Sequence, residues 1–238
     1  MELPSAAAEE KRSYVKRMFT AIAPRYDLLN HLLSLNIDKR WRREAVKLLG
    51  WGRAPSGVYL DLCAGTLDLA AELAGRPRFR GRVVAADFVV EMLALGRGKA
   101  EGVRAVGADA LALPFPSAHF SGCMVGFGIR NLADIRAGLA EIARVLSPGG
   151  RLVVLEFSIP RAWPMRSLYL FYFRRLLPLI GKAISRHSSA YRYLPESVAG
   201  FPDPKRFEEC LRSEGFRDVG ARALTLGIAT LYWGTARG

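Results

Sequence analysis

Residues 58–70 read VYLDLCAGTLDLA, and this stretch decides the fold. An apolar run closes at Asp61, and a small-residue turn around Gly65 leads directly into helix-forming residues. This order is typical of the first strand, turn and helix of an open α/β sheet. Small residues let a ligand approach the backbone, and the helix N-terminus presents unpaired N–H groups. Because ligands of such sheets bind beyond the carboxyl ends of the strands, we expect the floor of a nucleotide-type pocket here.

The charges at this turn do not suit a dinucleotide. A dinucleotide site uses three glycines in a G-x-G-x-x-G pattern to hold a pyrophosphate, whereas here Gly65 stands alone between Asp61 and Asp68. Two carboxylates would repel a pyrophosphate, so an NAD-dependent oxidoreductase is disfavoured. They suit a cationic ligand without phosphates, and S-adenosylmethionine, with its sulfonium and ammonium groups, fits that description.

The chain has 238 residues, half of them hydrophobic, and a formal net charge of +13. We expect a single domain at residues 11–238 behind a flexible segment at residues 1–10. The three cysteines are scattered and lack metal-site spacing, so we predict a reducing compartment and no metal site. The first residues do not resemble a secretory signal, and no nucleic-acid module accompanies the charge. We therefore expect a cytoplasmic protein that contacts the inner face of the membrane and binds no nucleic acid.

Residues 11–50 precede the first strand and predict a helical cap on the sheet. Apolar residues recur at three- and four-residue steps, as in an amphipathic helix, until Pro24 marks a bend. Asp38 is expected to cap the helix that follows the bend. Tyr26 and Asp27 stand at the bend itself, where a polar pair often lies at the mouth of a pocket.

Residues 82–87 predict the second strand, which ends at Asp87. Asp87 follows Asp61 by one strand–helix–strand unit, close to the spacing at which a strand-end carboxylate binds both ribose hydroxyls of a nucleoside. A carboxylate suits that role because it accepts two hydrogen bonds from a vicinal diol. Capping of the next helix is a compatible alternative. Phe88 and Met92 come next and are expected to be apolar walls for an adenine.

The third strand is predicted at residues 103–106, followed by Asp109 and Ala110. Asp109 could bind the adenine amino group while the small Ala110 leaves room for the ring; ordinary turn chemistry is the alternative for this aspartate. The fourth strand, at residues 123–127, runs into Arg130 and Asn131, which bring dense hydrogen-bonding capacity to the same rim. A loop with a helix-capping asparagine is the alternative there.

A helix at residues 134–146 and a fifth strand at 151–157 continue the same pattern, and a last helix and an antiparallel strand pair close the chain. Residues 160–190 interrupt the pattern with a densely apolar insertion. Arg174 and Arg175 break this insertion well short of the ~20 apolar residues of a membrane span. We predict a lid or interfacial helix whose arginines meet lipid headgroups, within a substrate insertion at residues 160–200. A dimer or core helix is the alternative.

Five motifs then indicate a family, and from about Tyr14 to its end the chain resembles the ubiquinone/menaquinone biosynthesis C-methyltransferases, which are S-adenosylmethionine-dependent and include demethylmenaquinone methyltransferases. The resemblance implies a Rossmann-like class I methyltransferase fold: a mostly parallel seven-stranded sheet with helices on both faces. The motifs are FTAIAPRYDLLN at 19–30, LPFP at 113–116, GFGIRN at 126–131, EFS at 156–158 and YRYLPES at 191–197.

Carried over by position, the resemblance implies cofactor contacts at several residues already singled out and at two further ones. The expected cofactor-binding set is Asp61, Gly65, Thr66, Asp87, Phe88, Asp109, Ala110 and Gly126. A serine can occur in the family at the position of Gly126. The chain departs from the family at Leu67, where a glycine is expected and a larger side chain could crowd the cofactor. It also departs from the family at three other positions: Ile159 stands where a lysine is common, Leu226 where the family has a glycine, and Tyr232 where it has a histidine.

The expected reaction is methyl transfer from S-adenosylmethionine to a ring carbon of a polyprenylated quinol in menaquinone or ubiquinone biosynthesis. Loss of the phenolic proton makes the ortho carbon nucleophilic, and alignment of that carbon with the methyl group supplies much of the acceleration. We place Tyr26, Arg130 and Asn131 around the phenolic oxygen as catalytic residues. An O- or N-methyltransferase and a non-catalytic quinone- or cofactor-binding subunit are the alternatives. A homodimer is a further expectation.

Overall fold

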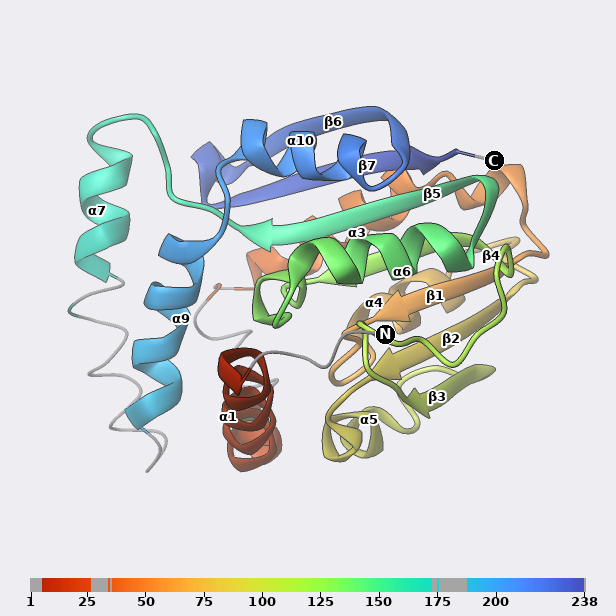
Figure 1. Ribbon diagram of the computed structural model, residues 1–238, viewed down its shortest axis with the longest axis horizontal. Coiled ribbons are helices and arrows are strands. Elements are labelled where there is room, and N and C mark those ends of the chain that lie inside the picture. Colours follow the sequence, from red (N-terminus) through yellow and green to blue (C-terminus); the bar gives the residue numbers. More distant parts are fainter. Residues whose placement is uncertain (1–5, 27–33, 35, 173–174, 176–187, 238) are drawn as a thin grey trace.

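The computed structural model describes residues 6–26, 34, 36–172, 175 and 188–237, and these build one seven-stranded sheet between helices (Figure 1). The strands lie in the order β3-β2-β1-β4-β5-β7-β6, so the predicted mostly parallel α/β fold is confirmed. Their bounds are β1 Val58–Leu62, β2 Arg82–Asp87, β3 Val103–Gly107, β4 Phe120–Gly126, β5 Leu146–Phe157, β6 Phe216–Leu224 and β7 Ala229–Ala236.

The strands β1 to β5 pair in parallel, and the hairpin β6–β7 adds two antiparallel strands at the β5 edge. β4 and β5 begin earlier than predicted, at Phe120 and Leu146, because these two residues pair with each other across a register shift before Gly122. The winding reverses between β1 and β4, and the carboxyl ends of both strands meet there. This reversal is where ligands of open α/β sheets bind.

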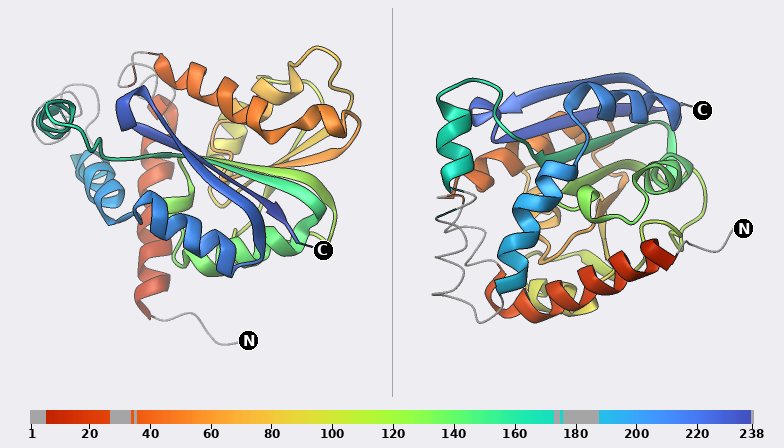
Figure 2. Two further views of the ribbon diagram at one scale, coloured as in Figure 1. Left: turned by 90° about the horizontal axis from the view of Figure 1, so that it is seen from above. Right: turned by 60° about the vertical axis from the view of Figure 1, so that its left-hand side comes forward.

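Helices cover both faces of the sheet (Figure 2). The helices α3, α4 and α5 pack on one face, and α6 and α10 pack on the other. The bounds of the helices are α1 Ala6–Ile22, α3 Ile37–Leu49, α4 Asp68–Ala74, α5 Val90–Gly96, α6 Ile135–Val145, α7 Met165–Phe171, α9 Ser188–Gly200 and α10 Pro204–Ser213. The 3-10 turns are η1 Ala23–Arg25, η2 Trp51–Arg53, η3 Ile129–Asn131 and η5 Thr225–Gly227.

Alternation along β1 divides its side chains between two hydrophobic cores. Leu60 and Leu62 belong to the core under α6 and α10, whereas Tyr59 belongs to the core under α3, α4 and α5. A parallel strand that is buried on both faces has no side that faces solvent. Asp61 is therefore a buried charge-bearing residue by position, with 1% of its surface exposed.

Aspartates fix the beginnings of α6 and α10. Asp134 accepts hydrogen bonds from two backbone N–H groups of the first turn of α6, and Asp203 does the same for α10. The prediction that Asp38 caps α3 is wrong. Asn36 is the cap residue, with a left-handed φ of 61°, and the Asp38 carboxylate instead pairs with the buried Arg42 one turn later.

Three helices from distant parts of the sequence lie together over the carboxyl ends of the strands (Figure 1). α1 begins at Ala6, so residues 6–10 are helical where a flexible segment was predicted. α1 contacts α9 through the rings of Tyr14 and Tyr193, whose centroids lie 5.6 Å apart. α7 and α9 share a small apolar cluster that includes the buried Tyr169 and Val198. We call α1, α7 and α9 the cover.

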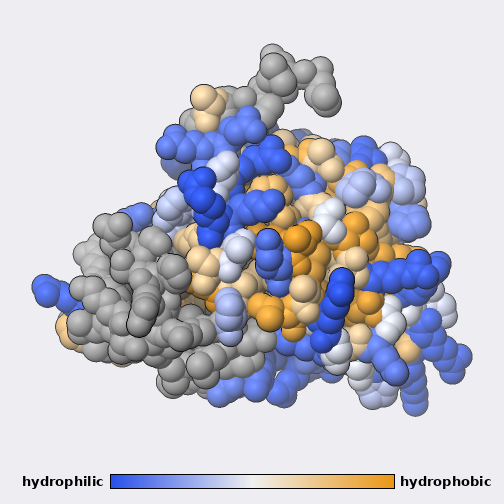
Figure 3. Space-filling model, turned by 90° about the horizontal axis from the view of Figure 1, so that it is seen from below, coloured by the Kyte–Doolittle hydropathy of each residue, from blue (hydrophilic) through white to orange (hydrophobic). Residues whose placement is uncertain are grey.

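The apolar insertion is described only in part, because residues 173–174 and 176–187 lie outside the described residues, as do 27–33 with Asp27. The described part holds the short helix α7, whose Leu168 and Phe171 are exposed at its surface. None of the helices in the described ranges is both long enough and apolar enough to cross a membrane. On the lower face of the molecule, apolar side chains gather in the middle of a charged surround (Figure 3).

Candidate functional site

A cavity opens at the carboxyl ends of β1, β2 and β4, beneath α1. Its floor is the turn between β1 and α4, where Gly65 adopts a left-handed φ of 52° that suits glycine. The Gly65 N–H donates to Asp87 Oδ2 across 2.8 Å, so the first turn is tied to the end of the neighbouring strand. Of the predicted site residues, those that line this cavity are Tyr26, Gly65, Asp87, Phe88, Asp109, Ala110, Gly126 and Asn131.

Asp87 lines the cavity and accepts hydrogen bonds from backbone N–H groups through both carboxylate oxygens. Its second oxygen, Oδ1, accepts from the N–H of Val89 at 2.8 Å. Val89 is the cap residue of α5 and no side chain caps the first turn, so the helix-capping alternative for Asp87 is wrong. Burial raises the pKa of this carboxyl, and the backbone N–H groups oppose that rise. Each carboxylate oxygen can accept more than one hydrogen bond, so Asp87 retains acceptor capacity toward a ligand diol.

Asp61 and Thr66 do not line the cavity, and their predicted contact with the cofactor stays a prediction. Asp61 lies beneath the turn and accepts from the N–H of Ala70 at 2.8 Å, inside the first turns of α4. Burial raises the pKa of Asp61 to about 8, with smaller contributions from the negative charges of Asp68 and Asp87. Asp61 therefore supports the floor of the site from within the sheet.

Asp68 does not face the cavity either. Its carboxylate pairs with Arg42 at 3.1 Å and with Lys99 at 2.7 Å, which neutralises its charge at the start of α4. The preceding residue, Leu67, has a left-handed φ of 69°, and the backbone there favours the glycine of the family. Its side chain is buried close to Gly96 and does not line the cavity. Leu67 therefore does not crowd the site, contrary to the expectation from sequence.

The side of the cavity that holds Phe88 and Asp109 carries cations that the sequence did not predict. Arg12 of α1 forms an ion pair with Asp109. The guanidinium carbon of Arg12 lies 5.5 Å from the centre of the Phe88 ring, and Lys16 Nζ lies 5.4 Å from it. The four-residue spacing of Arg12 and Lys16 places both on one face of the helix, but nothing in the sequence indicates which acid or ring they meet.

Glycines at the end of β4 let the third 3-10 turn approach the floor. A Cβ on Gly126 would lie 2.7 Å from Leu69 Cδ1, so a serine, which the family allows there, needs Leu69 to move. A Cβ on Gly128 would collide with Cys63. The turn η3 therefore packs directly on the turn after β1 and brings Asn131 into the cavity wall.

Tyr26 and Asn131 line the cavity, but Arg130 does not. Arg130 has 8% of its surface exposed, and its guanidinium forms an ion pair with Glu156 at 2.6 Å. The same group donates to the carbonyl of Phe127 and, from Nε, to Ser197 Oγ at 3.3 Å. These contacts hold Nε and Nη1 of Arg130 within the protein, and its predicted contact with the reacting ring stays a prediction.

The sequence also did not predict the role of Glu156, the partner of Arg130, although Glu156 lies in the EFS motif. It is fully buried at the end of β5 and accepts from the N–H groups of Phe157 and Arg130 as well as from the Arg130 side chain. Burial raises the pKa of this carboxyl, against the opposing charge of Arg130. A buried acid without a partner is costly, so Glu156 and Arg130 stabilise one another.

The groups that line the cavity are suited to a nucleoside. An acceptor for a diol, Asp87, stands beside an aromatic face, Phe88, and a small residue, Ala110. Tyr26 and Asn131 supply a hydroxyl and an amide at the same cavity, beside the glycines of β4 and the turn η3. The arrangement therefore provides for a nucleoside together with a second, oxygen-bearing molecule.

The chain matches known proteins over nearly its whole length. Residues 6–236 match the ubiE/COQ5 methyltransferase family. The chain is 49% identical to a demethylmenaquinone methyltransferase of Thermus thermophilus, over 91% of this chain and 99% of that one. It is 46% identical to a ubiquinone/menaquinone biosynthesis C-methyltransferase of Geobacter sulfurreducens, over 94% of this chain and 89% of that one. Among solved structures, a SAM-dependent methyltransferase of Thermotoga maritima superposes with a TM-score of 0.67 at 17% identity, over 93% of this chain and 99% of that one.

We predict that Asp61 makes the stability of the protein depend on pH. Because its pKa is raised to about 8, the folded state binds a proton that the unfolded state releases above pH ~4. Stability should therefore fall as pH rises from 5 to 8, and Asp61→Asn should remove that fall. The free energy of unfolding of Asp61→Asn, relative to that of the natural protein, should rise by up to about 1.4 kcal/mol for each pH unit.

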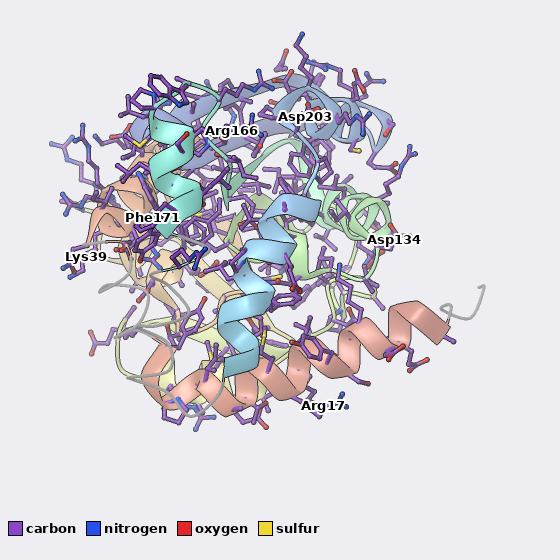
Figure 4. The ribbon with its side chains drawn as sticks, turned by 90° about the vertical axis from the view of Figure 1, so that its left-hand side faces the viewer. Arg17, Lys39, Asp134, Arg166, Phe171 and Asp203 are labelled. Atoms are coloured by element: carbon purple, nitrogen blue, oxygen red, sulfur yellow. The ribbon has the colours of Figure 1, made fainter. Side chains whose placement is uncertain are left out.

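Urea unfolding of both proteins at pH 5, 6.5 and 8 measures this difference. Asp134→Asn, at the exposed cap of α6, is the matched control (Figure 4). A difference between Asp61→Asn and the natural protein that stays constant across this range would show that Asp61 ionises with its ordinary pKa.

Proposed function

The chain belongs to the ubiE/COQ5 methyltransferase family, and on that premise we propose that it methylates a ring carbon of demethylmenaquinol, with S-adenosylmethionine as the methyl donor. The observation that carries this proposal is the shared cavity of Asp87, Tyr26 and Asn131, in which nucleoside-binding and oxygen-binding groups face one space. The relatives named for menaquinone and ubiquinone biosynthesis support the substrate class.

Four residues would hold the cofactor. Asp87 would accept the ribose hydroxyls, and Phe88 and Ala110 would flank the adenine. Asp109 would accept a hydrogen bond from the adenine amino group in place of its ion pair with Arg12. The bound cofactor supplies an electrophilic methyl group on its sulfonium, and no basic residue of this set needs to act on that group.

At the acceptor, the phenolic oxygen of the quinol would lie against Tyr26 and Asn131. Loss of its proton to water gives a phenolate, whose ortho carbon forms the bond to the methyl group as the bond from methyl to sulfur breaks. The ring then loses its hydrogen from that carbon as a proton, which restores the aromatic quinol. Hydrogen bonds that strengthen as charge develops on the oxygen lower the barrier. Arg130 would act indirectly, since its charge is balanced by Glu156 and it donates to the carbonyl of Phe127, two residues before η3.

The reaction is tested by incubating the full chain with methyl-labelled S-adenosylmethionine and a short-chain demethylmenaquinol, with the demethylated ubiquinol precursor in parallel. Mass spectrometry should find one labelled methyl on a ring carbon of the naphthoquinol. A methyl ether would favour an O-methyltransferase instead. Cofactor binding without turnover on either quinol would favour a non-catalytic binding subunit.

Replacement of Asp87 should weaken cofactor binding. In Asp87→Asn, one acceptor oxygen becomes an amide donor and the charge is lost, so hydrogen bonds worth about 1.5–3 kcal/mol are removed. The dissociation constant for S-adenosylmethionine, measured by calorimetry, should rise about 10- to 100-fold. The control is Asp203→Asn, at the exposed cap of α10 (Figure 4). Unchanged cofactor affinity in Asp87→Asn would refute the ribose assignment.

We further propose that the end of the cover beside α7 rests on an anionic membrane surface. Trp163 is 81% exposed, and Leu168, Phe171 and Leu226 are also exposed. Leu226 comes close to this region because Ser158 Oγ donates to the carbonyl of Gly227 at 2.8 Å. The exposed Arg161 and Arg166 adjoin these apolar side chains in the sequence, and Arg166 lies on the same helix as Phe171 (Figure 4). Apolar side chains among basic ones are the composition of an interfacial surface.

Flotation with vesicles of phosphatidylcholine containing phosphatidylglycerol tests this contact. The double variant Trp163→Ala/Phe171→Ala should lower the bound fraction at least tenfold, because two large apolar side chains leave the interface. Val90→Ala/Leu95→Ala removes two other exposed apolar side chains, from α5, and should bind like the natural protein. Equal loss in both double variants, or no loss in either, would contradict a specific contact through α7.

A further inference from the structure

α9 reaches the cavity through the turn η3, and two side-chain hydrogen bonds join the two elements. Tyr193 Oη donates to Asn131 Oδ1 at 3.0 Å, and Arg130 Nε donates to Ser197 Oγ at 3.3 Å. Asn131 lines the cavity, whereas Tyr193 does not. We propose that Tyr193 is a positioning residue that fixes the Asn131 amide so that its N–H, rather than its oxygen, is offered to the methyl acceptor.

Two partners determine which way the Asn131 amide points. Its nitrogen, Nδ2, donates to the carbonyl of Phe127 at 3.4 Å, and its oxygen accepts from Tyr193. A flipped amide would set its oxygen against the Phe127 carbonyl, so that two acceptors would face each other. It would also oblige Tyr193 to accept rather than donate. The combination of a carbonyl on one side and a hydroxyl donor on the other therefore selects one orientation.

The selected orientation leaves one N–H of Asn131 with no protein acceptor among the described residues. A phenolate oxygen accepts hydrogen bonds and donates none, so an amide N–H beside it stabilises the charge, while an amide oxygen would repel it. Without Tyr193, only the Phe127 carbonyl, 3.4 Å from the amide nitrogen, would oppose the flip. The amide would then sample an unproductive orientation.

Tyr193 is itself held for this role by its surroundings. Its ring packs against the ring of Tyr14 on α1. Burial raises the pKa of its hydroxyl, so the group stays protonated and remains a donor at neutral pH. Leu194 and Val198, on the same helix, pack in the cluster shared with α7, so the position of α9 follows that of the cover.

The inference rests on the proposed phenolic acceptor, and Tyr193→Phe tests it because this variant keeps the ring and removes one hydroxyl. We expect kcat for the quinol to fall about tenfold while the dissociation constant for S-adenosylmethionine stays unchanged. The pH at which kcat reaches half its maximum should shift upward, since the bound phenol then ionises less readily. Tyr14→Phe, which removes a hydroxyl from the partner ring, is the matched control and should keep both values.

A double-variant cycle separates positioning from general loosening. In the Asn131→Ala background, Tyr193→Phe should have little further effect on kcat, because its target is gone. Equal effects of Tyr193→Phe with and without Asn131 would overturn the inference, as would wild-type kcat and an unshifted pH profile in Tyr193→Phe.

A second readout does not depend on turnover. In 15N spectra, the side-chain amide signals of Asn131 should shift or broaden in Tyr193→Phe but not in Tyr14→Phe. If the natural protein methylates no quinol while these signals behave as expected, the proposed function fails and the orientation of Asn131 stands. If the signals are identical in all three proteins, Tyr193 does not set the amide, whatever the substrate.

Discussion

Carboxylates at the carboxyl ends of three parallel strands are the constraint on which the site depends; Asp61 and Glu156 are buried, and Asp87 is half-buried at the cavity. Asp61 on β1, Asp87 on β2 and Glu156 on β5 each accept hydrogen bonds from backbone N–H groups near the strand ends, mostly those of the turns that follow. Burial raises the pKa of all three. Because a buried carboxylate requires these donors, each one fixes the path of its turn. The result is a floor whose shape is held from inside the sheet, leaving the cavity wall to side chains that can meet ligands.

These three acids differ in how far the sequence predicts their roles. Asp87 was predictable as a site residue because it ends an apolar strand one unit after the glycine turn. The burial of Asp61 follows from strand alternation, but the choice between a ligand and a structural support depends on α4, whose Ala70 N–H meets it. The partner of Arg130 lies 26 residues away on β5. No local pattern in the sequence pairs those two residues, so the sequence predicts a contact of Arg130 with the substrate and not its ion pair with Glu156.

The same limit applies to the cover. The amphipathic pattern before the first strand predicted a helix, and α1 is that helix. Its contacts come from residues that are remote in sequence: Arg12 meets Asp109, and Tyr14 meets Tyr193. Periodicity tells which face of a helix is apolar but not which loop it will meet. Leu67 shows a related limit. A left-handed residue at a glycine position could point its side chain into the cavity or away from it. Packing of the Leu67 side chain near Gly96 directs it away.

One helix contacts Asp109 on one side of the cavity and the elements around Asn131 on the other. α1 has 17 residues and is therefore about 25 Å long. Along that length Arg12 meets the acid expected beside the adenine, Tyr14 meets α9, and Lys11 Nζ donates to the carbonyl of Leu132 just after η3 at 2.6 Å. Burial lowers the pKa of Lys11, as expected for an ammonium group held against backbone carbonyls rather than in water. A displacement of α1 that freed Asp109 for a ligand would therefore also disturb η3 and α9. Through these contacts, α1 joins the side of the cavity that holds Asp109 to the elements that hold Asn131.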